Sequence, residues 1–139
     1  QFVGDKIREW LDSNIAAEEI GLIVRSPGQF HRAQAALRIA NADFNTMSRA
    51  MEWVTGKVSL CTMHLAKGLE FKCVMLMACD DDVLPLSERI DAVMGDEQAM
   101  KEVDDTERHL LYVACTRARD ELVITSAGMA SDYLDDLLG

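Results

Sequence analysis

The sequence predicts a three-layer α/β domain with a mostly parallel sheet, and three observations support this. Apolar runs of strand length alternate with segments of helical periodicity, as in folds whose strands are separated by helices. Residues 73–79 are continuously apolar, which is typical of a strand buried on both faces of a parallel sheet. The 139 residues, 49% of them apolar, suffice for one core, so we expect residues 1–139 to form a single domain.

The first half of the chain predicts a helix, a strand, a second helix and a second strand in turn. Apolar residues at helical spacing indicate a helix from Val3 to about Ala17. An apolar run from Glu19 to Val24, closed by Ser26-Pro27-Gly28, indicates a buried strand. A second amphipathic helix is expected over residues 29–41, followed by a short strand at about 43–47.

The second half continues the alternation. The expected order is a strand at 58–63, a polar connection at 64–72, a strand at 73–79, a loop at about 80–95, a helix at 97–116, a strand at 122–126 and a short helix at 133–138. Working groups of open α/β sheets lie beyond the carboxyl ends of the strands. We therefore look for function in three loops, at 25–32, at 62–72 and from residue 80 onward.

Charge is distributed unevenly along the chain. The net charge is −10, which by itself opposes nucleic-acid binding. Residues 1–72, however, carry nine Lys/Arg against eight Asp/Glu, whereas residues 80–107 carry two against eleven. Any DNA contact must come from local groups, and the acidic region is an alternative candidate for binding a protein.

Cysteine usage and apolar patterning indicate a cytoplasmic protein. Cys61, Cys73, Cys79 and Cys115 lie in apolar segments without C-x-x-C spacing, which favours buried free thiols over a metal or redox site. No apolar stretch is long enough to cross a membrane, and no secretory leader is evident. Because residue 1 is Gln and the last residues have a helical pattern, we expect a fragment of a longer protein.

Two segments carry groups suited to phosphate chemistry. Residues 62–70 bring together a hydroxyl, an imidazole, an ammonium, a glycine and a carboxylate. Hydroxyl and backbone N–H groups suit phosphate oxygens, and a carboxylate suits a ribose hydroxyl. In the second segment, Arg117 and Arg119 follow an amphipathic helix, where an arginine could stabilise a phosphoryl group or simply neutralise the helix end. The residue types alone leave both questions open.

Both segments resemble motifs of UvrD/Rep-like superfamily 1 DNA helicases. Residues 62–71 read T-M-H-L-A-K-G-L-E-F and are similar to motif V, T-x-H-x-x-K-G-L-E-F. Residues 107–119 resemble motif VI, E-R-x-L-x-Y-V-A-x-T-R-A, and residues 23–26 with Gln29 resemble motif IVa more weakly. The resemblance covers roughly residues 20–126 and implies the C-terminal RecA-like motor domain of an ATP-dependent helicase.

The resemblance implies a role for individual residues. Arg117 would be an arginine finger at the ATP γ-phosphate, with Glu70 and Gly68 also at the nucleotide. Single-stranded DNA would be contacted by Thr62 and His64, and with less support by Arg25 and Ser26. Glu107, Arg108 and Tyr112 could equally be structural residues that fix the helix before Arg117.

The sequence also departs from the family pattern. It contains no G-x-x-x-x-G-K-[ST] loop and no D-E-x-Q segment, so ATP and Mg²⁺ would be held mainly by an N-terminal RecA-like domain of the same chain. Pro27 and Phe30 differ from the polar residues expected in motif IVa, and no motif IV arginine is evident. Only about thirty residues separate Gln29 from Val58, so the large inserted domain of other members is either naturally missing or was removed. We favour a short form, because residues 45–56 do not resemble a flexible Gly/Ser linker.

Three functional hypotheses remain at this stage. The first is a helicase motor domain that hydrolyses ATP only with its partner domain, so that the isolated fragment is inactive. The second is a degenerate RecA-like domain that serves as a protein-interaction or regulatory module. The third is a subunit of a nuclease-associated helicase.

Overall fold

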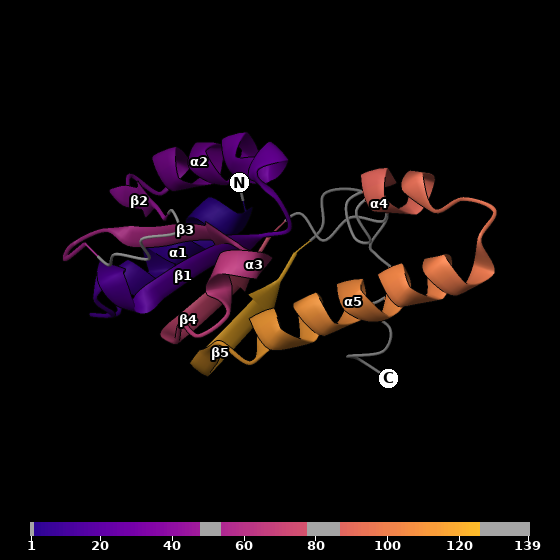
Figure 1. Cartoon of the computed structure of the whole chain (residues 1–139). Coiled ribbons are helices and arrows are strands. Elements are labelled where there is room, and N and C mark those ends of the chain that lie inside the picture. Colours follow the sequence, from indigo (N-terminus) through magenta and orange to yellow (C-terminus); the bar gives the residue numbers. More distant parts are fainter. Residues whose placement is uncertain (1, 48–53, 78–86, 126–139) are drawn as a thin grey trace.

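The computed structural model describes residues 2–47, 54–77 and 87–125, and these residues form a five-stranded parallel sheet with helices on both faces (Figure 1). The strands are β1 (Ile20–Val24), β2 (Phe44–Thr46), β3 (Val58–Thr62), β4 (Phe71–Leu76) and β5 (Ala118–Ile124). Their order across the sheet is β2-β3-β1-β4-β5, and every neighbouring pair is parallel. The predicted α/β class with a mostly parallel sheet is confirmed.

Five α-helices connect and cover these strands. They are α1 (Phe2–Asp12), α2 (Phe30–Ile39), α3 (Met63–Ala66), α4 (Ser87–Ala92) and α5 (Glu97–Cys115), with 3₁₀ turns η1 (Ala17–Glu19) and η2 (Pro27–Gln29). Asp96 caps α5, its carboxylate accepting a hydrogen bond from the Ala99 N–H at 3.0 Å, as an N-cap aspartate does. Of the described helices, none is sufficiently long and apolar to cross a membrane.

Several sequence-based boundaries were wrong. The helix predicted from Val3 to about Ala17 ends at Asp12, and the strand predicted from residue 73 begins at Phe71. The first residues of the predicted polar connection 64–72 belong to the one-turn helix α3, and the predicted loop 80–95 contains α4. The last strand begins at Ala118, four residues before the predicted start. The prediction missed these residues because β5 is an edge strand whose first residues are largely exposed and polar, and so show no apolar pattern. The predicted helix at 133–138 and Cys79 lie outside the described residues.

Side chains alternate across the sheet into two core clusters, one beneath each helical layer. In β1, Leu22 and Val24 join a cluster with residues of α1 and α2, whereas Ile23 joins a cluster with residues of α3 and α5. All five residues of β1 are buried, as expected for the central strand of a parallel sheet. The two clusters make this a three-layer domain.

The segments that follow β1 and β3 begin at the carboxyl edge of the sheet, whereas Glu70 and Arg117 directly precede β4 and β5 at its amino edge. Val24 of β1 is in register with Thr62 of β3, so the chain leaves both strands at the same edge. Helix α3 begins there and packs against α5. Figure 1 shows α5 continuing well past the sheet, with α4 near its far end. Residues 40–57 connect α2 to β3, and β2 lies within them.

Candidate functional site

The loop between β3 and β4 alternates buried anchors with exposed polar residues. Its anchors in the second core cluster are Met63, Ala66 and Leu69. Its exposed residues are His64, Lys67, Gly68 and Glu70. The loop is therefore held to the sheet by apolar side chains while its polar groups face solvent.

Thr62 and Gly68 fix the backbone of this loop. The Leu65 N–H donates to Thr62 Oγ1 at 3.3 Å, which makes Thr62 the N-cap of α3. Gly68 has a φ of +85°, a left-handed conformation that glycine adopts without steric cost. A Cβ built at Gly68 would meet no atom within 4 Å, so backbone conformation and not space requires the glycine. Thr62 is only 7% exposed, and its hydroxyl is used for capping in this structure.

Arg117 lies just after α5 and is tied to both that helix and the loop. Its Nε donates to the Val113 carbonyl at 3.2 Å, and its Nη1 donates to the Leu69 carbonyl at 3.2 Å. Its Nη2 donates to Thr116 Oγ1 at 3.0 Å, and its carbonyl accepts from the Phe71 N–H at 2.8 Å. The guanidinium thus neutralises a helix C-terminus, one of the two roles considered above, and also joins the two predicted motifs.

Glu70 and Arg119 form a second link between the same segments. Arg119 Nε lies 3.7 Å from Glu70 Oε1, and the side chains are 50% and 64% exposed. An ion pair this open contributes little to stability and opens readily. Glu70, at the amino end of β4, is therefore accessible to a ligand.

Arg25, like Thr62, is a predicted DNA contact that the structure buries. Its side chain is 4% exposed, and Nε and Nη2 donate to the two carboxylate oxygens of Glu107 at 2.9 and 2.5 Å. The guanidinium is therefore engaged inside the domain. Ser26, the next residue, is partly exposed at the start of η2. The sequence offered no signal for this pairing, because 82 positions separate the two residues.

Buried thiols near the site are poorly suited to nucleophilic or metal chemistry. Burial raises the pKa of Cys115, in the last turn of α5, to about 11 and that of Cys61, in β3, to about 12. Cys61, Cys73 and Cys115 are free thiols. Among the residues that the structure describes, no group of three or more His, Cys, Asp or Glu side chains could hold a metal ion.

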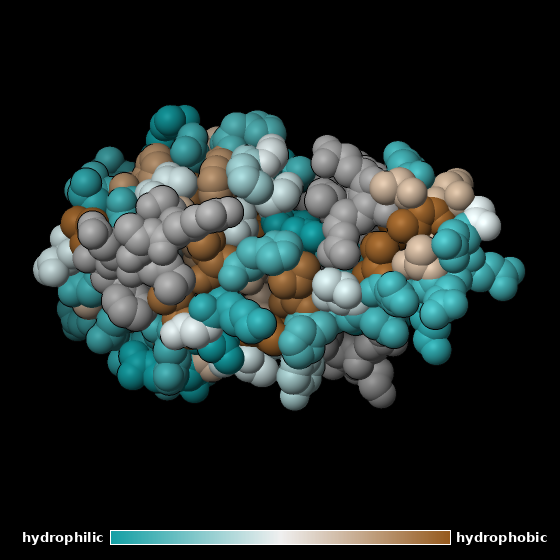
Figure 2. Space-filling model, in the orientation of Figure 1, coloured by the Kyte–Doolittle hydropathy of each residue, from teal (hydrophilic) through white to brown (hydrophobic). Residues whose placement is uncertain are grey.

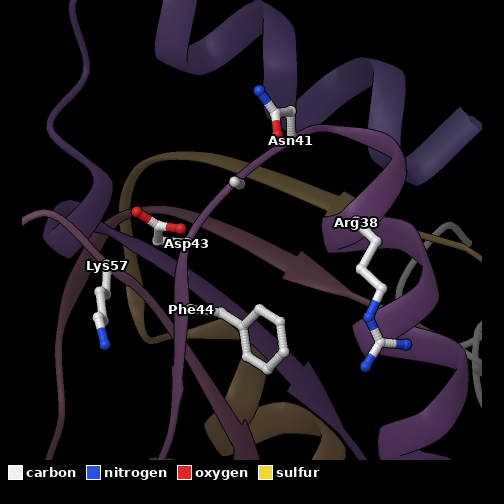
Figure 3. A pocket seen from close by; sticks show the side chains of 6 residues that line it. Arg38, Asn41, Asp43, Phe44 and Lys57 are labelled. Carbon is white, nitrogen blue, oxygen red and sulfur yellow. The ribbon is translucent and has the colours of Figure 1, made fainter.

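A hollow of about 340 Å³ lies beside β2, the strand on the other side of the sheet from β5 (Figure 3). It is lined by Arg38, Asn41, Ala42, Asp43, Phe44 and Lys57. Phe44 begins β2 and Lys57 immediately precedes β3, so the hollow is at the amino ends of parallel strands. It lies beside β2 and β3, whereas Glu70 and Arg117 precede β4 and β5 on the other side of the sheet.

The exposed side of α5 is acidic and polar. Its exposed residues include Glu97, Glu102 and Asp105, and Figure 2 shows hydrophilic residues along its visible side. Apolar residues gather where α4 meets α5, and Met94 there is 71% exposed. The part of the acidic region that belongs to α5 is thus displayed on the outer part of this helix, away from Arg117.

The all-parallel sheet, the helices on both faces and the polar loops at the carboxyl edge define a RecA-like α/β domain. Residues 39–128, more than half of the chain, match the family model of the UvrD-like helicase C-terminal domain. The chain belongs to this family.

Similar proteins agree with the family assignment. The chain is 40% identical over 90 residues to the ATP-dependent DNA helicase PcrA of Bacillus subtilis (strain 168), an alignment that covers 63% of the chain and 11% of that protein. It is 43% identical over 72 residues to PcrA of Leuconostoc citreum, covering 52% of the chain and 8% of that protein. The alignments thus span only about a tenth of these relatives.

The fold has a solved counterpart. The C-terminal domain of a possible DNA helicase from Lactobacillus plantarum WCFS1 superimposes with a TM-score of 0.62 at 19% sequence identity. The superposition covers 94% of this chain and 67% of the other. At this identity the likeness concerns the fold alone, and the chain is the C-terminal domain of a UvrD-like DNA helicase by its family match.

Proposed function

We propose that this domain is half of an ATP-driven DNA motor, in which Arg117 acts as an arginine finger and residues 62–70 couple DNA to ATP. The observation that carries the proposal is the direct bonding of Arg117 to the loop through Leu69 and Phe71. A displacement of either segment would therefore strain or break hydrogen bonds to the other. In the whole protein, opening and closing of a cleft between two RecA-like domains would move it along single-stranded DNA, 3′ to 5′ by family analogy.

Glu70 and Arg117, which lie at the amino ends of β4 and β5, offer groups that fit a nucleotide. Arg117 offers a permanently charged, planar donor for the γ-phosphate, and Glu70 offers an exposed carboxylate for the ribose. Gly68 permits the turn that presents Glu70. Three hydrogen bonds hold the Arg117 guanidinium against its own domain, so the proposed role requires the side chain to leave at least some of these acceptors.

The remaining components of the ATPase would come from an N-terminal RecA-like domain. That domain would supply the phosphate-binding loop, the Mg²⁺ ligands and the group that orients the attacking water. The present chain alone should therefore hydrolyse no ATP at a useful rate. Robust ATP hydrolysis by the purified 139-residue chain would contradict this division of roles.

Single-stranded DNA would be contacted at the carboxyl edge of the sheet. We propose His64, Thr62 and Ser26 as contacts. Thr62 is the last residue of β3, and His64 and Ser26 each lie two residues after the end of β3 and β1, which are adjacent strands. Thr62 would contribute mainly through the backbone it caps, since its side chain is buried. Arg25 is left out of this set because its donors serve Glu107.

The decisive experiment is Arg117→Ala in the full-length protein, measured as DNA-stimulated ATP turnover. Loss of an arginine finger lowers kcat by about 10³- to 10⁵-fold. Arg38→Ala is a matched control, because Arg38 is an exposed arginine in the last turn of α2 beside the opposite edge of the sheet. Wild-type turnover in Arg117→Ala would show that Arg117 is not an arginine finger and would contradict the motor proposal.

The acidic outer face of α5 supports a second candidate, a non-catalytic interaction module. Under that alternative, Arg117→Ala would leave DNA-stimulated turnover intact. Reversal of charge at Glu97, Glu102 and Asp105 would instead abolish binding of a basic partner protein. The two measurements separate the two functions.

A further inference from the structure

The Arg25–Glu107 pair is a buried cross-link between the sheet and α5. Arg25 is 3% exposed and Glu107 0%, and they are the two charged residues buried in the part of the chain that the structure describes. Two hydrogen bonds join them side by side, Nε to Oε1 at 2.9 Å and Nη2 to Oε2 at 2.5 Å. A forked contact of this kind fixes orientation as well as distance.

Arg25 is adjacent in sequence to the proposed DNA contact Ser26, and Glu107 is on the helix that ends just before Arg117. Arg25 follows the last residue of the central strand β1 and precedes Ser26. Glu107 lies on the face of α5 that also buries Val103, Leu111 and Ala114. Arg117 is ten positions further along, about 15 Å at the rise of an α-helix. The pair therefore joins the carboxyl end of β1 to the helix that presents Arg117.

Stability alone gives a weak reason for this pair. Burying two charges costs desolvation energy that their attraction only partly returns, and well-packed apolar side chains often hold a fold equally well. Orientation gives a stronger reason. The outer half of α5 extends beyond the sheet (Figure 1), and among the described residues it contacts α4 there and not the strands. A two-point contact at Glu107 restricts both rotation and sliding, on which the direction of Arg117 depends.

We propose that Arg25 and Glu107 are a positioning pair for Arg117, and that through Arg25 the orientation of α5 is tied to the Ser26 loop. Neither residue touches the nucleotide; both act through the helix. The inference rests on the proposed function, since it assigns the pair to the turnover step that Arg117 performs. It also reassigns Arg25 from a DNA-backbone contact to an internal connection.

The test uses the full-length protein with Arg25→Met and Glu107→Leu combined, which replaces the pair by apolar groups of similar size. We expect a thermal unfolding midpoint close to that of the wild type, and KM for ATP and Kd for single-stranded DNA changed less than about 2-fold. At saturating ATP and DNA, kcat should fall about 10- to 100-fold, because small misplacements of a catalytic group cost this much. Arg25→Lys keeps the charge without the fork, and kcat should fall there too.

Several outcomes would overturn the inference. One is a stably folded double variant with wild-type kcat. If the double variant fails to fold, wild-type kcat in folded Arg25→Lys would overturn the inference instead. Another is loss of DNA affinity as large as the loss of kcat, which would restore Arg25 as a DNA contact.

A control and a reference variant complete the design. Lys6→Met breaks another ion pair between a helix and the sheet, Lys6–Glu121 at 3.0 Å between α1 and β5, and should leave kcat unchanged. An equal fall of kcat in Lys6→Met would show that any such pair has the effect and would overturn the assignment. Arg117→Ala separates the two proposals: retained turnover there refutes the proposed function, whereas lost turnover there with wild-type kcat in the pair variant refutes only the positioning role.

Discussion

Arg117 Nη1 donates to the Leu69 carbonyl at 3.2 Å, and this bond joins the end of α5 to the loop between β3 and β4. The joint is reinforced by the Phe71 N–H, which donates to the Arg117 carbonyl at 2.8 Å. The side-chain bond can break during a catalytic cycle, whereas the backbone bond belongs to the sheet. The two motifs thus share a fixed backbone connection and a releasable side-chain connection.

Arg117→Ala should have a modest effect on the stability of this chain, in contrast to its large proposed effect on turnover. The guanidinium is partly exposed, so its three acceptors can bond to water when it is removed. We expect a loss of about 1 kcal/mol in the free energy of unfolding. Urea denaturation of the 139-residue chain measures this. A loss several times larger would mean that Arg117 is chiefly a structural residue.

Gly68→Ala should destabilise the domain through backbone conformation alone. Its φ of +85° costs about 1–2 kcal/mol for a residue with a Cβ. Gly28→Ala is the matched control, because Gly28 does not share this left-handed conformation and its added Cβ would only approach Ser26 Oγ at 3.7 Å. Denaturant unfolding of the two variants should place Gly68→Ala clearly below Gly28→Ala. Equal stabilities would show that the loop relaxes without cost.

Gly21→Ala should be more damaging, for a reason of packing. A Cβ at Gly21 of β1 would lie 2.6 Å from the Phe71 ring of β4, and Phe71 is a fully buried side chain of the second core cluster. Relief requires the ring or the strand to move, and overpacking of this kind costs about 1–3 kcal/mol. The double variant Gly21→Ala/Phe71→Leu should recover part of that loss in thermal unfolding. If the double variant recovers no stability, the clash with the Phe71 ring is not the cause of the loss.

Local patterns allowed most of the elements to be predicted from the sequence. The strand predicted at 19–24 is β1 at 20–24, because an apolar run closed by Ser26-Pro27-Gly28 has one natural interpretation. The strand β5 was placed too late because its first residues, Ala118 to Glu121, are on an exposed edge and show no apolar pattern. Helix α4 was missed since its six residues are too few to display helical periodicity.

The candidate site was predictable only as far as its residues are close in sequence. Residues 62–70 form one loop, as their spacing suggested, and a helix ends just before Arg117. The ties from Arg117 to Leu69 and from Arg25 to Glu107 cross 48 and 82 positions. The spacing of residues in a sequence does not predict contacts over such separations, so only the structure reveals that Arg25 is buried against Glu107.

Alkaline pH should destabilise the domain through Cys61. Burial raises the pKa of this thiol to about 12 in the folded chain, against about 8.5 for an exposed thiol. Between these values the unfolded chain loses the thiol proton while the folded chain retains it. The unfolded state therefore binds fewer protons, and the free energy of unfolding falls as pH rises above about 8.5.

The corresponding measurement is urea unfolding at pH 8 and at higher pH values up to about 11, for the wild type and for Cys61→Ala. Cys61→Ala should be less stable at pH 8, because it leaves a cavity in β3. Its further loss on raising the pH should nevertheless be smaller than that of the wild type, since one buried thiol no longer contributes. Cys115, whose pKa is raised to about 11, accounts for part of the remaining slope, and Cys61→Ala/Cys115→Ala should flatten it further. Identical slopes in all three proteins would assign the alkaline loss to other groups and contradict this origin.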